Sequence, residues 1–220
     1  MKKLKMKKNQ YKGKLIVFEG TDGAGKTTML QMTAEYISSI VGKSNVICIK
    51  QPTDISRKTK LFQKMMYSEC HDDIDYRAVQ LLTMSDRVQH LHEIIEPALK
   101  EGKFVICDRY IYTSLANMLA RGYVREKWFY NVSSYLLKPD ITFLARVSAE
   151  VAINRIRSRE EEKDRYLNEE LLKNVLVNFI QMAKKEKFVV IDTDMKPEAV
   201  FCQIKEELYR RGVLIEKKQF

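Results

Sequence analysis

The chain has 220 residues, of which 45% are hydrophobic and 31% charged, and these proportions are ordinary for a globular protein. This length allows a sizeable buried core and favours one domain or at most two, while no apolar run is long enough to span a membrane. The formal net charge is +10, but residues 1–14 carry seven lysines and no acidic residue, which leaves only +3 for the rest of the chain.

The lysine-rich start of the chain has no apolar pattern that could be buried. We therefore expect residues 1–13 to form a basic, solvated and disordered tail. A tether to nucleic acid or anionic lipid is the less favoured alternative, and we expect neither a membrane nor a nucleic acid as a partner. No apolar segment follows the lysines before the first strand, so the tail does not have the pattern of a secretory signal.

The next stretch, residues 15–30, reads LIVFEGTDGAGKTTML. A short apolar run typical of a buried strand breaks into glycines and restarts with good helix formers at Lys26. The segment contains the spacing G-x-x-x-x-G-K-T, which is the signature of a phosphate-binding loop, or P-loop, between a strand and a helix. A glycine-rich turn without a ligand is the alternative, but the flanking strand and helix patterns favour the P-loop.

The residue types in this loop are those that a phosphate-binding site requires. Glycines permit backbone conformations in which successive N–H groups point inward at phosphate oxygens. Lys26 supplies a positive charge to the β- and γ-phosphates, and the Thr27 hydroxyl is placed to hold Mg²⁺. The residues expected to bind the phosphates of ATP are Gly20, Asp22, Gly23, Ala24, Gly25, Lys26, Thr27 and Thr28.

Beyond the P-loop, apolar runs alternate with helical patterns. Helix signals cover residues 26–41, 56–67, 73–100, 114–121, 126–137, 148–157, 168–185 and 197–211, and strand signals cover 15–18, 46–49, 104–107, 141–146 and 188–191. Strands that are nearly all apolar indicate a parallel sheet with helices on both faces. We therefore predict an α/β protein with a five-stranded parallel sheet, in one domain over residues 14–212, followed by a C-terminal tail over 213–220.

The carboxyl ends of the first three strands are expected to form one cleft, because ligands of parallel sheets bind at that edge. Residues 20–26, 51–54 and 108–110 follow these strands. From this position Asp108 could reach Mg²⁺ across from Thr27. A helix cap or a partner for Arg109 is the other reading of this carboxylate.

The four cysteines, Cys48, Cys70, Cys107 and Cys202, are scattered and form no C-x-x-C pair. Cys48 and Cys107 fall inside apolar strand patterns, so we expect both to be buried as small hydrophobic side chains. This usage indicates a reducing, cytoplasmic setting.

Several motifs in this order resemble the thymidylate kinase family, a branch of the P-loop nucleoside monophosphate kinases. They are FEGTDGAGKTT at 18–28, Pro-Thr at 52–53, Asp-Arg at 86–87, CDRYIYTSLA at 107–116, KPDITFL at 138–144, and RIRSR followed by DRY at 155–166. The resemblance covers about residues 14–212. It implies transfer of the γ-phosphoryl group of ATP to thymidine monophosphate (dTMP) with Mg²⁺, and we expect a homodimer.

The resemblance also assigns roles in acceptor binding. Asp22 would contact the 3′-hydroxyl of the acceptor sugar, and Arg109 and Arg57 its phosphate, which a planar guanidinium matches well. Arg87 and Ser114 would lie at the base. Surface salt bridges are the alternative for Arg57 and Arg109.

Members of this family supply a catalytic arginine from the P-loop or from a flexible lid. The variable P-loop positions 21–24 hold no cation here, whereas the lid, about residues 155–167, is rich in them. We therefore expect a lid arginine to act in catalysis, with Arg157 and Arg159 as candidates beside Lys26 and Asp108, and Arg155 to contact ATP. Pairing of these arginines with Glu160, Glu161 and Glu162 is the alternative. The lid cations are Arg155, Arg157, Arg159, Lys163 and Arg165.

Three positions depart from the family pattern. Thr83 stands where an aromatic ring usually stacks on thymine, and Asn117 replaces an aromatic residue beside the sugar. Gln51 replaces a common glutamate. Another aromatic residue, Phe62, Tyr67 or Tyr112, could instead supply the missing ring, which would leave an ordinary thymidylate kinase. These departures leave two alternatives to thymidylate: another pyrimidine or ribonucleoside monophosphate as the acceptor, or an ATP-binding module that has lost transfer and docks through its basic tail.

Overall fold

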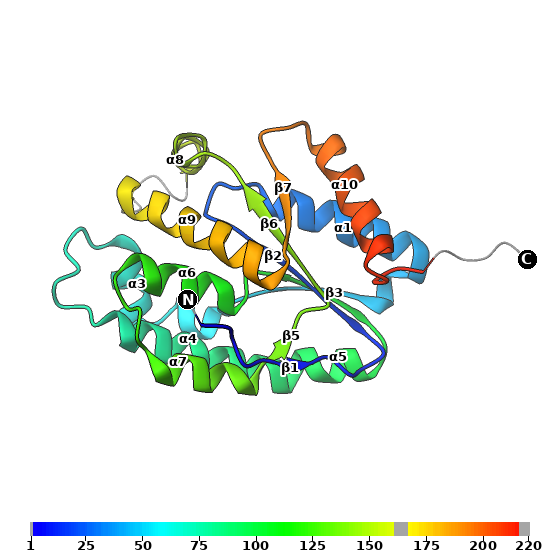
Figure 1. Cartoon of the computed structure of the whole chain (residues 1–220), viewed down its shortest axis with the longest axis horizontal. Helices are drawn as coiled ribbons and strands as arrows, with labels where there is room; N and C mark the ends of the chain where they lie inside the picture. Colours follow the sequence, from blue (N-terminus) through cyan, green and yellow to red (C-terminus); the bar gives the residue numbers. More distant parts are fainter. Residues whose placement is uncertain (1, 161–166, 216–220) are drawn as a thin grey trace, which may run out of the picture.

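Five parallel strands form the central sheet of the protein, and the computed structural model describes residues 2–160 and 167–215 (Figure 1). The order across the sheet is β3-β4-β2-β6-β7, so the strand that leads into the P-loop is central. The strands are β2 (Lys14–Glu19), β3 (Val46–Lys50), β4 (Phe104–Asp108), β6 (Ile141–Arg146) and β7 (Val189–Asp192). The predicted five-stranded parallel sheet is confirmed.

Helices cover both faces of this sheet (Figure 1). Side chains alternate along β2, and Leu15 and Val17 therefore belong to one apolar core while Ile16 and Phe18 belong to the other. The helices are α1 (Lys26–Val41), α2 (Asp54–Arg57), α3 (Lys60–Tyr67), α4 (Tyr76–His90), α5 (Glu96–Lys100), α6 (Ile111–Ala120), α7 (Lys127–Val132), α8 (Ala149–Arg157), α9 (Glu169–Glu186) and α10 (Pro197–Arg210). Each of these described helices is too short or too polar to cross a membrane.

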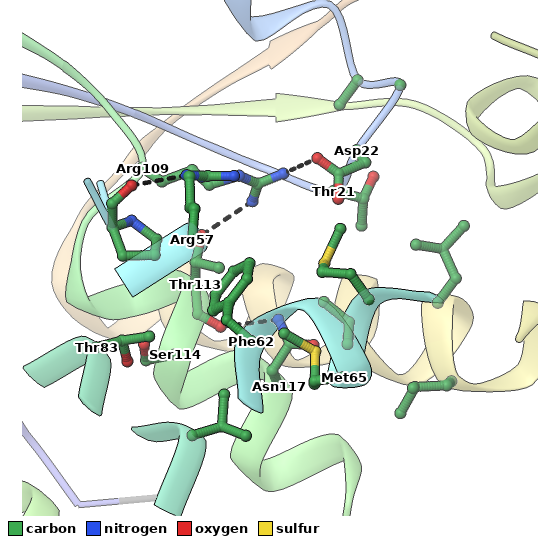
Figure 2. A pocket seen from close by; sticks show the side chains of 18 of the residues that line it. Thr21, Asp22, Arg57, Phe62, Met65, Thr83, Arg109, Thr113, Ser114 and Asn117 are labelled. Atoms are coloured by element: carbon green, nitrogen blue, oxygen red, sulfur yellow. Dashed lines mark hydrogen bonds and ion pairs between the residues drawn. The ribbon is translucent and has the colours of Figure 1, made fainter. Parts of the chain in front are cut away.

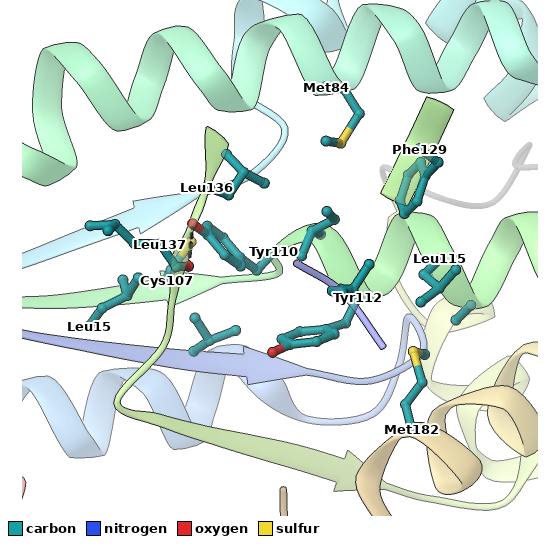
Figure 3. Packing of buried hydrophobic residues seen from close by; sticks show 14 of the residues in the cluster. Leu15, Met84, Cys107, Tyr110, Tyr112, Leu115, Phe129, Leu136, Leu137 and Met182 are labelled. Atoms are coloured by element: carbon teal, nitrogen blue, oxygen red, sulfur yellow. Dashed lines mark hydrogen bonds between the residues drawn. The ribbon is translucent and has the colours of Figure 1, made fainter. Parts of the chain in front are cut away.

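The larger core lies between the sheet and the layer of α4, α6, α7 and α9 (Figure 3). Tyr110 is fully buried there, and its hydroxyl donates to the carbonyl of Leu137 at 3.0 Å, which satisfies its polar atom inside the core. The smaller core packs α1, α8 and α10 against the opposite face. The two cores hold the strand ends that form the cleft in fixed positions.

Two expected helices are divided in the structure. The segment 56–67 is split into α2 and α3, because the Thr59 side chain accepts from the amide of Phe62 and begins a new helix. The segment 73–100 begins only at Tyr76, after the capping residue Asp75, and contains a π-helical turn at Leu91–Ile95. A wider turn is a common way to accommodate a residue such as Pro97, whose nitrogen has no hydrogen to donate.

Two burial expectations are corrected. Cys107 is buried, but Cys48 is exposed, because β3 is an edge strand and its outer face is covered incompletely. At the other end of the chain, Val213 and Leu214 are each only 4% exposed and pack into the smaller core, so the C-terminal tail begins later than residue 213.

The basic N-terminal segment also differs from the expected disordered tail. Residues Lys7–Lys8 form β1, which pairs in parallel with β5 (Leu137–Lys138). Leu4 is 8% exposed and belongs to the larger core, and the amide of Lys5 donates to Ser133 Oγ at 2.9 Å. The expectation failed because one leucine and backbone hydrogen bonds are enough to attach a segment whose side chains are mostly charged.

This attachment predicts a stability effect. Leu4→Ala removes a buried side chain and is expected to lower the free energy of unfolding by about 2 kcal/mol. Lys3→Ala, at an exposed neighbouring position, is the matched control and should change it by less than about 0.5 kcal/mol. Urea denaturation measures both. Equal effects of the two variants would show that the segment does not contribute through Leu4.

Candidate active site

One cleft lies at the carboxyl edge of the sheet and is lined by residues from the P-loop, β3, β4, α3, α4, α6 and α9. Its enclosed volume is about 240 Å³. The ends of β2, β4 and β3 are neighbours in the sheet, so the three segments predicted from the sequence do meet there. Figure 2 shows the side chains of the P-loop, α3 and α6 that face this space.

The P-loop joins β2 to α1 in the way that the glycine spacing predicts. Gly25 has φ of 72° and precedes the first residue of α1. Gly23 has φ of 76°, and a Cβ atom there would lie 2.3 Å from the carbonyl oxygen of Ala152 on α8. Both a left-handed backbone and a close approach therefore require glycine at position 23.

Lys26 is the buried cation of this loop. Lys26 is only 6% exposed, and its Nζ donates to the carbonyl oxygen of Thr21 at 2.7 Å. Burial, and secondarily the positive charge of Arg109, lower the pKa of Lys26 to about 8. The charged ammonium group lacks a full complement of partners, as a group that receives phosphate oxygens requires.

Asp108 and Thr27 face the same cavity. Asp108 Oδ1 is buried, and no described residue hydrogen-bonds to it. A buried carboxylate oxygen without a protein partner, opposite a threonine hydroxyl, suits a hard cation such as Mg²⁺ or its water ligands. The residues present therefore fit the expected metal, although the described residues hold no cluster of three or more His, Cys, Asp or Glu side chains that could bind one alone.

Arg109 connects the P-loop to the acceptor half of the cleft (Figure 2). Its Nη1 donates to the carbonyl of Gly20 at 2.9 Å and to Thr113 Oγ1 at 3.1 Å, and its Nη2 forms an ion pair with Asp22. The resemblance implied that Asp22 contacts the acceptor sugar, and in this structure its carboxylate is paired with Arg109. A nucleotide that binds here would contact Arg109 and Asp22 as an ion pair.

Arg57 is the second arginine of this region. Its Nε donates to the carbonyl of Pro52 at 2.7 Å, and its guanidinium carbon lies 5.7 Å from the ring centre of Phe62 (Figure 2). Burial lowers the pKa of Arg57, and the positive charge of Arg109 lowers it further. Two guanidinium groups in one partly buried cavity repel each other, and a bound anion between them would relieve that repulsion.

The inner end of the cavity is built by Arg87, Thr83, Ser114 and Asn117. Arg87 is 1% exposed; it donates to the carbonyls of Thr83 at 3.0 Å and of Tyr110 at 3.3 Å. No described residue bonds to its Nε. Burial lowers the pKa of Arg87, with the charges of Glu19 and Asp86 acting in the opposite direction. These four residues come together as the sequence predicted.

Some residues of the cleft were not predicted from the sequence. Arg121 donates to Asn117 Oδ1 at 2.8 Å and lies 4.2 Å from the ring centre of Tyr76. Tyr76 and Phe179 add aromatic surface to the cavity beside Phe62, one of the three aromatic residues considered from the sequence. No motif marks Arg121, Tyr76 or Phe179, because they enter the site through the packing of α4, α6 and α9.

The lid residues separate in the structure. Arg155 donates to the carbonyls of Gly23 at 3.4 Å and Thr193 at 3.0 Å, so it lies on the donor side of the P-loop. Arg159 lines the cavity, whereas Arg157 does not. Lys163 and Arg165 fall outside the described residues.

A parallel α/β sheet, a P-loop at its central strand and a set of arginines in the same cleft define a P-loop nucleotide-binding protein with a second anion-binding site. Comparison with known proteins narrows this class. Residues 18–204 match the family model described as thymidylate kinase. The chain belongs to the thymidylate kinase family, whose members are nucleoside monophosphate kinases.

Individual relatives agree. The chain is 38% identical over 178 residues to a probable thymidylate kinase of Pyrococcus horikoshii, covering 79% of this chain and 84% of that protein. It is 34% identical over 206 residues to a probable thymidylate kinase of Pyrococcus abyssi, covering 90% and 98%. The crystal structure of thymidylate kinase from Ehrlichia chaffeensis superimposes with a TM-score of 0.66 at 26% identity, covering 89% of this chain and 98% of that one.

The burial of Lys26 predicts a pH-dependent stability effect. The pKa of Lys26 in the folded protein, about 8, lies below the ordinary lysine value of 10.5, so burial of the charged form destabilises the fold below pH 8. This cost falls as the pH rises from 8 toward 10.5. Lys26→Met removes the charge and is expected to raise the free energy of unfolding of the ligand-free protein at pH 7 by on the order of 1–3 kcal/mol, which raises its Tm.

Differential scanning fluorimetry from pH 7 to pH 10 measures this effect, and Lys50→Met, at another lysine that lines the cleft, is the comparison variant. The advantage of Lys26→Met should shrink with rising pH, and Lys50→Met should show no such trend. A Lys26→Met protein that is less stable than wild type at pH 7 would contradict the account.

Proposed function

We propose that the protein transfers the γ-phosphoryl group of ATP to dTMP and releases dTDP and ADP. The observation that carries this proposal is that Arg57 and Arg109 lie in the same cleft as the P-loop, with Arg109 bonded to Gly20 of that loop. A phosphate held by these arginines would face the γ-phosphate held at Lys26. Transfer requires such positioning and the neutralisation of charge on the moving group.

The proposed roles follow the two halves of the cleft. The P-loop amides, Lys26 and Arg155 would bind ATP, and Arg109 and Arg57 would bind the phosphate of dTMP. Thr27 and Asp108 would hold Mg²⁺, which when bound neutralises charge on the β- and γ-phosphates. Arg87, with an unpartnered Nε among the described residues, and Ser114 would contact the base.

The relatives support thymidylate as the acceptor, because those with more than 30% identity are named as thymidylate kinases or probable thymidylate kinases. A module without transfer activity is not favoured, since the P-loop, Asp108 and Arg109 are all in place. Acceptance of another pyrimidine or ribonucleotide in place of dTMP is not favoured either. A reducing, cytoplasmic setting is part of the same proposal.

We also propose a homodimer. Ile55 on α2 and Leu81 on α4 are 75% and 54% exposed, which suits apolar side chains at an interface between two copies. Sedimentation velocity of the full chain would test this, and a monomer at all concentrations would contradict it.

The central test is a panel of nucleoside monophosphates with labelled ATP and Mg²⁺. dTMP is expected to give the highest kcat/KM, and Lys26→Met is expected to abolish transfer, because its charge acts on the bound phosphates. Far-UV circular dichroism controls for folding of the variant. A different preferred acceptor would contradict the choice of dTMP, and turnover by folded Lys26→Met would contradict the P-loop assignment.

The lid arginines give a second prediction. Arg159 lines the cavity and Arg157 does not, so Arg159 is the proposed catalytic arginine. Arg159→Ala is expected to lower kcat about 100-fold or more, while Arg157→Ala, the matched control, should lower it by less than about tenfold. Steady-state kinetics at saturating nucleotides distinguish the two. The reverse order would assign the role to Arg157.

The base pocket gives a third prediction. Thr83 and Asn117 cannot stack on a base, whereas Phe62 lines the cavity beside Arg57 (Figure 2). Tyr67, which is 45% exposed, does not line this cavity, and Tyr112 packs against Phe188 in the larger core. We propose that Phe62 provides the aromatic face for thymine.

Phe62→Leu keeps the apolar volume but removes the ring, and it is expected to raise the KM for dTMP about tenfold, since base stacking contributes about 1–3 kcal/mol. Adding Thr83→Phe to this variant should restore part of the affinity, because it returns a ring to the same cavity. Tyr67→Leu on the same helix is the matched control. Loss without any rescue would show that Phe62 acts only in packing.

A further inference from the structure

We propose that Glu19 is a positioning residue for acceptor binding, which orients the guanidinium of Arg109 through the hydroxyl of Thr113. The inference deepens the proposed function and rests on it, because Arg109 is the residue proposed to hold the acceptor phosphate. Glu19 itself does not line the cleft.

Glu19 ends β2, and its side chain is fully buried against the start of α6. Oε1 accepts from the amide of Tyr110 at 2.9 Å and from the amide of Thr113 at 3.2 Å. Tyr110 precedes α6 and makes no capping bond with its own side chain. A carboxylate from a distant strand therefore caps this helix, where negative charge is favourable.

The second oxygen of Glu19 determines which way the Thr113 hydroxyl points. Thr113 Oγ1 lies 2.5 Å from Glu19 Oε2 and 3.1 Å from Arg109 Nη1. A carboxylate only accepts and a guanidinium only donates, so the single hydroxyl proton must lie on the bond to Glu19. The lone pairs of the Thr113 hydroxyl then point toward Arg109. The guanidinium of Arg109 therefore donates to an acceptor whose orientation is fixed.

The backbone of Arg109 needs this support. Its φ of 68° is in the left-handed region, which is costly for a residue with a side chain. Its amide donates to the carbonyl of Phe18 at 2.9 Å, and the next amide, that of Tyr110, donates to Glu19. Glu19 thus fixes both the main chain that follows Arg109 and the hydroxyl that its side chain contacts.

The cost of burying this carboxylate is consistent with a specific role. Burial raises the pKa of Glu19, while the hydrogen bond from Thr113 and the positive charge of Arg109 lower it. Two of the groups that compensate this burial, Thr113 and Arg109, also line the proposed acceptor site.

The test compares four variants of the full chain: Glu19→Gln, Thr113→Val, Thr113→Ser and the double variant Glu19→Gln/Thr113→Val. Glutamine keeps the size of Glu19 and still accepts from the two amides, but its NH₂ group then donates to Thr113. The hydroxyl proton no longer lies on that bond, so the direction of the lone pair that Arg109 uses is no longer fixed. Valine keeps the shape of Thr113 without the hydroxyl, and serine keeps the hydroxyl. Thermal unfolding establishes that each variant is folded.

We expect Glu19→Gln and Thr113→Val each to raise the KM and the Kd for dTMP about tenfold or more, with the KM for ATP changed less than about twofold. Thr113→Ser should be close to wild type. The double variant should be no weaker than the weaker single variant, because both changes break the same path.

Three results would overturn the inference: additive losses in the double variant, an equal rise in the KM for ATP and for dTMP, or unchanged dTMP binding in folded Glu19→Gln. If Glu19→Gln does not fold, Thr113→Val and Thr113→Ser decide the question by the same dTMP measurements. A wild-type protein that neither binds nor phosphorylates dTMP would instead overturn the proposed function, and the inference with it.

Discussion

The attachment of Arg109 to the end of β2 is the constraint on which the rest of the site depends. The Arg109 amide bonds to Phe18, its guanidinium bonds to Gly20, and its second terminal nitrogen pairs with Asp22. The same five-residue segment leads directly into the P-loop. One piece of backbone therefore sets the positions of both the loop that fits ATP and the arginine that fits the acceptor, so the distance between the two sites is fixed by the central strand.

The cleft concentrates buried charge. Lys26, Arg87 and Arg109 are each less than 9% exposed, and Glu19 is fully buried. Burial lowers the pKa of Lys26 to about 8 and raises the pKa of Glu19. Such groups destabilise a fold unless they are paired, and Arg87 Nε and Asp108 Oδ1 have no partner among the described residues. The ligand-free protein gives up stability in this region, and bound phosphates are the groups that would restore it.

The sequence predicts the sheet well, because each strand is a short apolar run and the P-loop fixes the central one. Helix starts at Ser148 and Asn168 were also predictable, since both side chains cap the first turn. The division of α2 from α3 was missed, although the cap of Thr59 on the amide of Phe62 is of the same local kind. The attachment of residues 4–8 was not predictable, because it depends on contacts far along the chain, such as the bond from the Lys5 amide to Ser133. In the site, the residues that follow the strand ends were predicted, whereas Glu19 and Arg121 were not, because Glu19 bonds to residues 110 and 113 and Arg121 lies over the ring of Tyr76.

The central claim is that the end of β2 fixes the distance between the ATP site and the acceptor site. The most direct test is the binding of one molecule in which adenosine and thymidine are joined through their 5′ positions by a polyphosphate chain. Isothermal titration calorimetry with the full chain and Mg²⁺ would measure it. The account predicts one bound molecule per chain, at an affinity at least about tenfold tighter than that of ATP or dTMP alone. Binding of two molecules per chain, or an affinity no better than that of ATP, would contradict it.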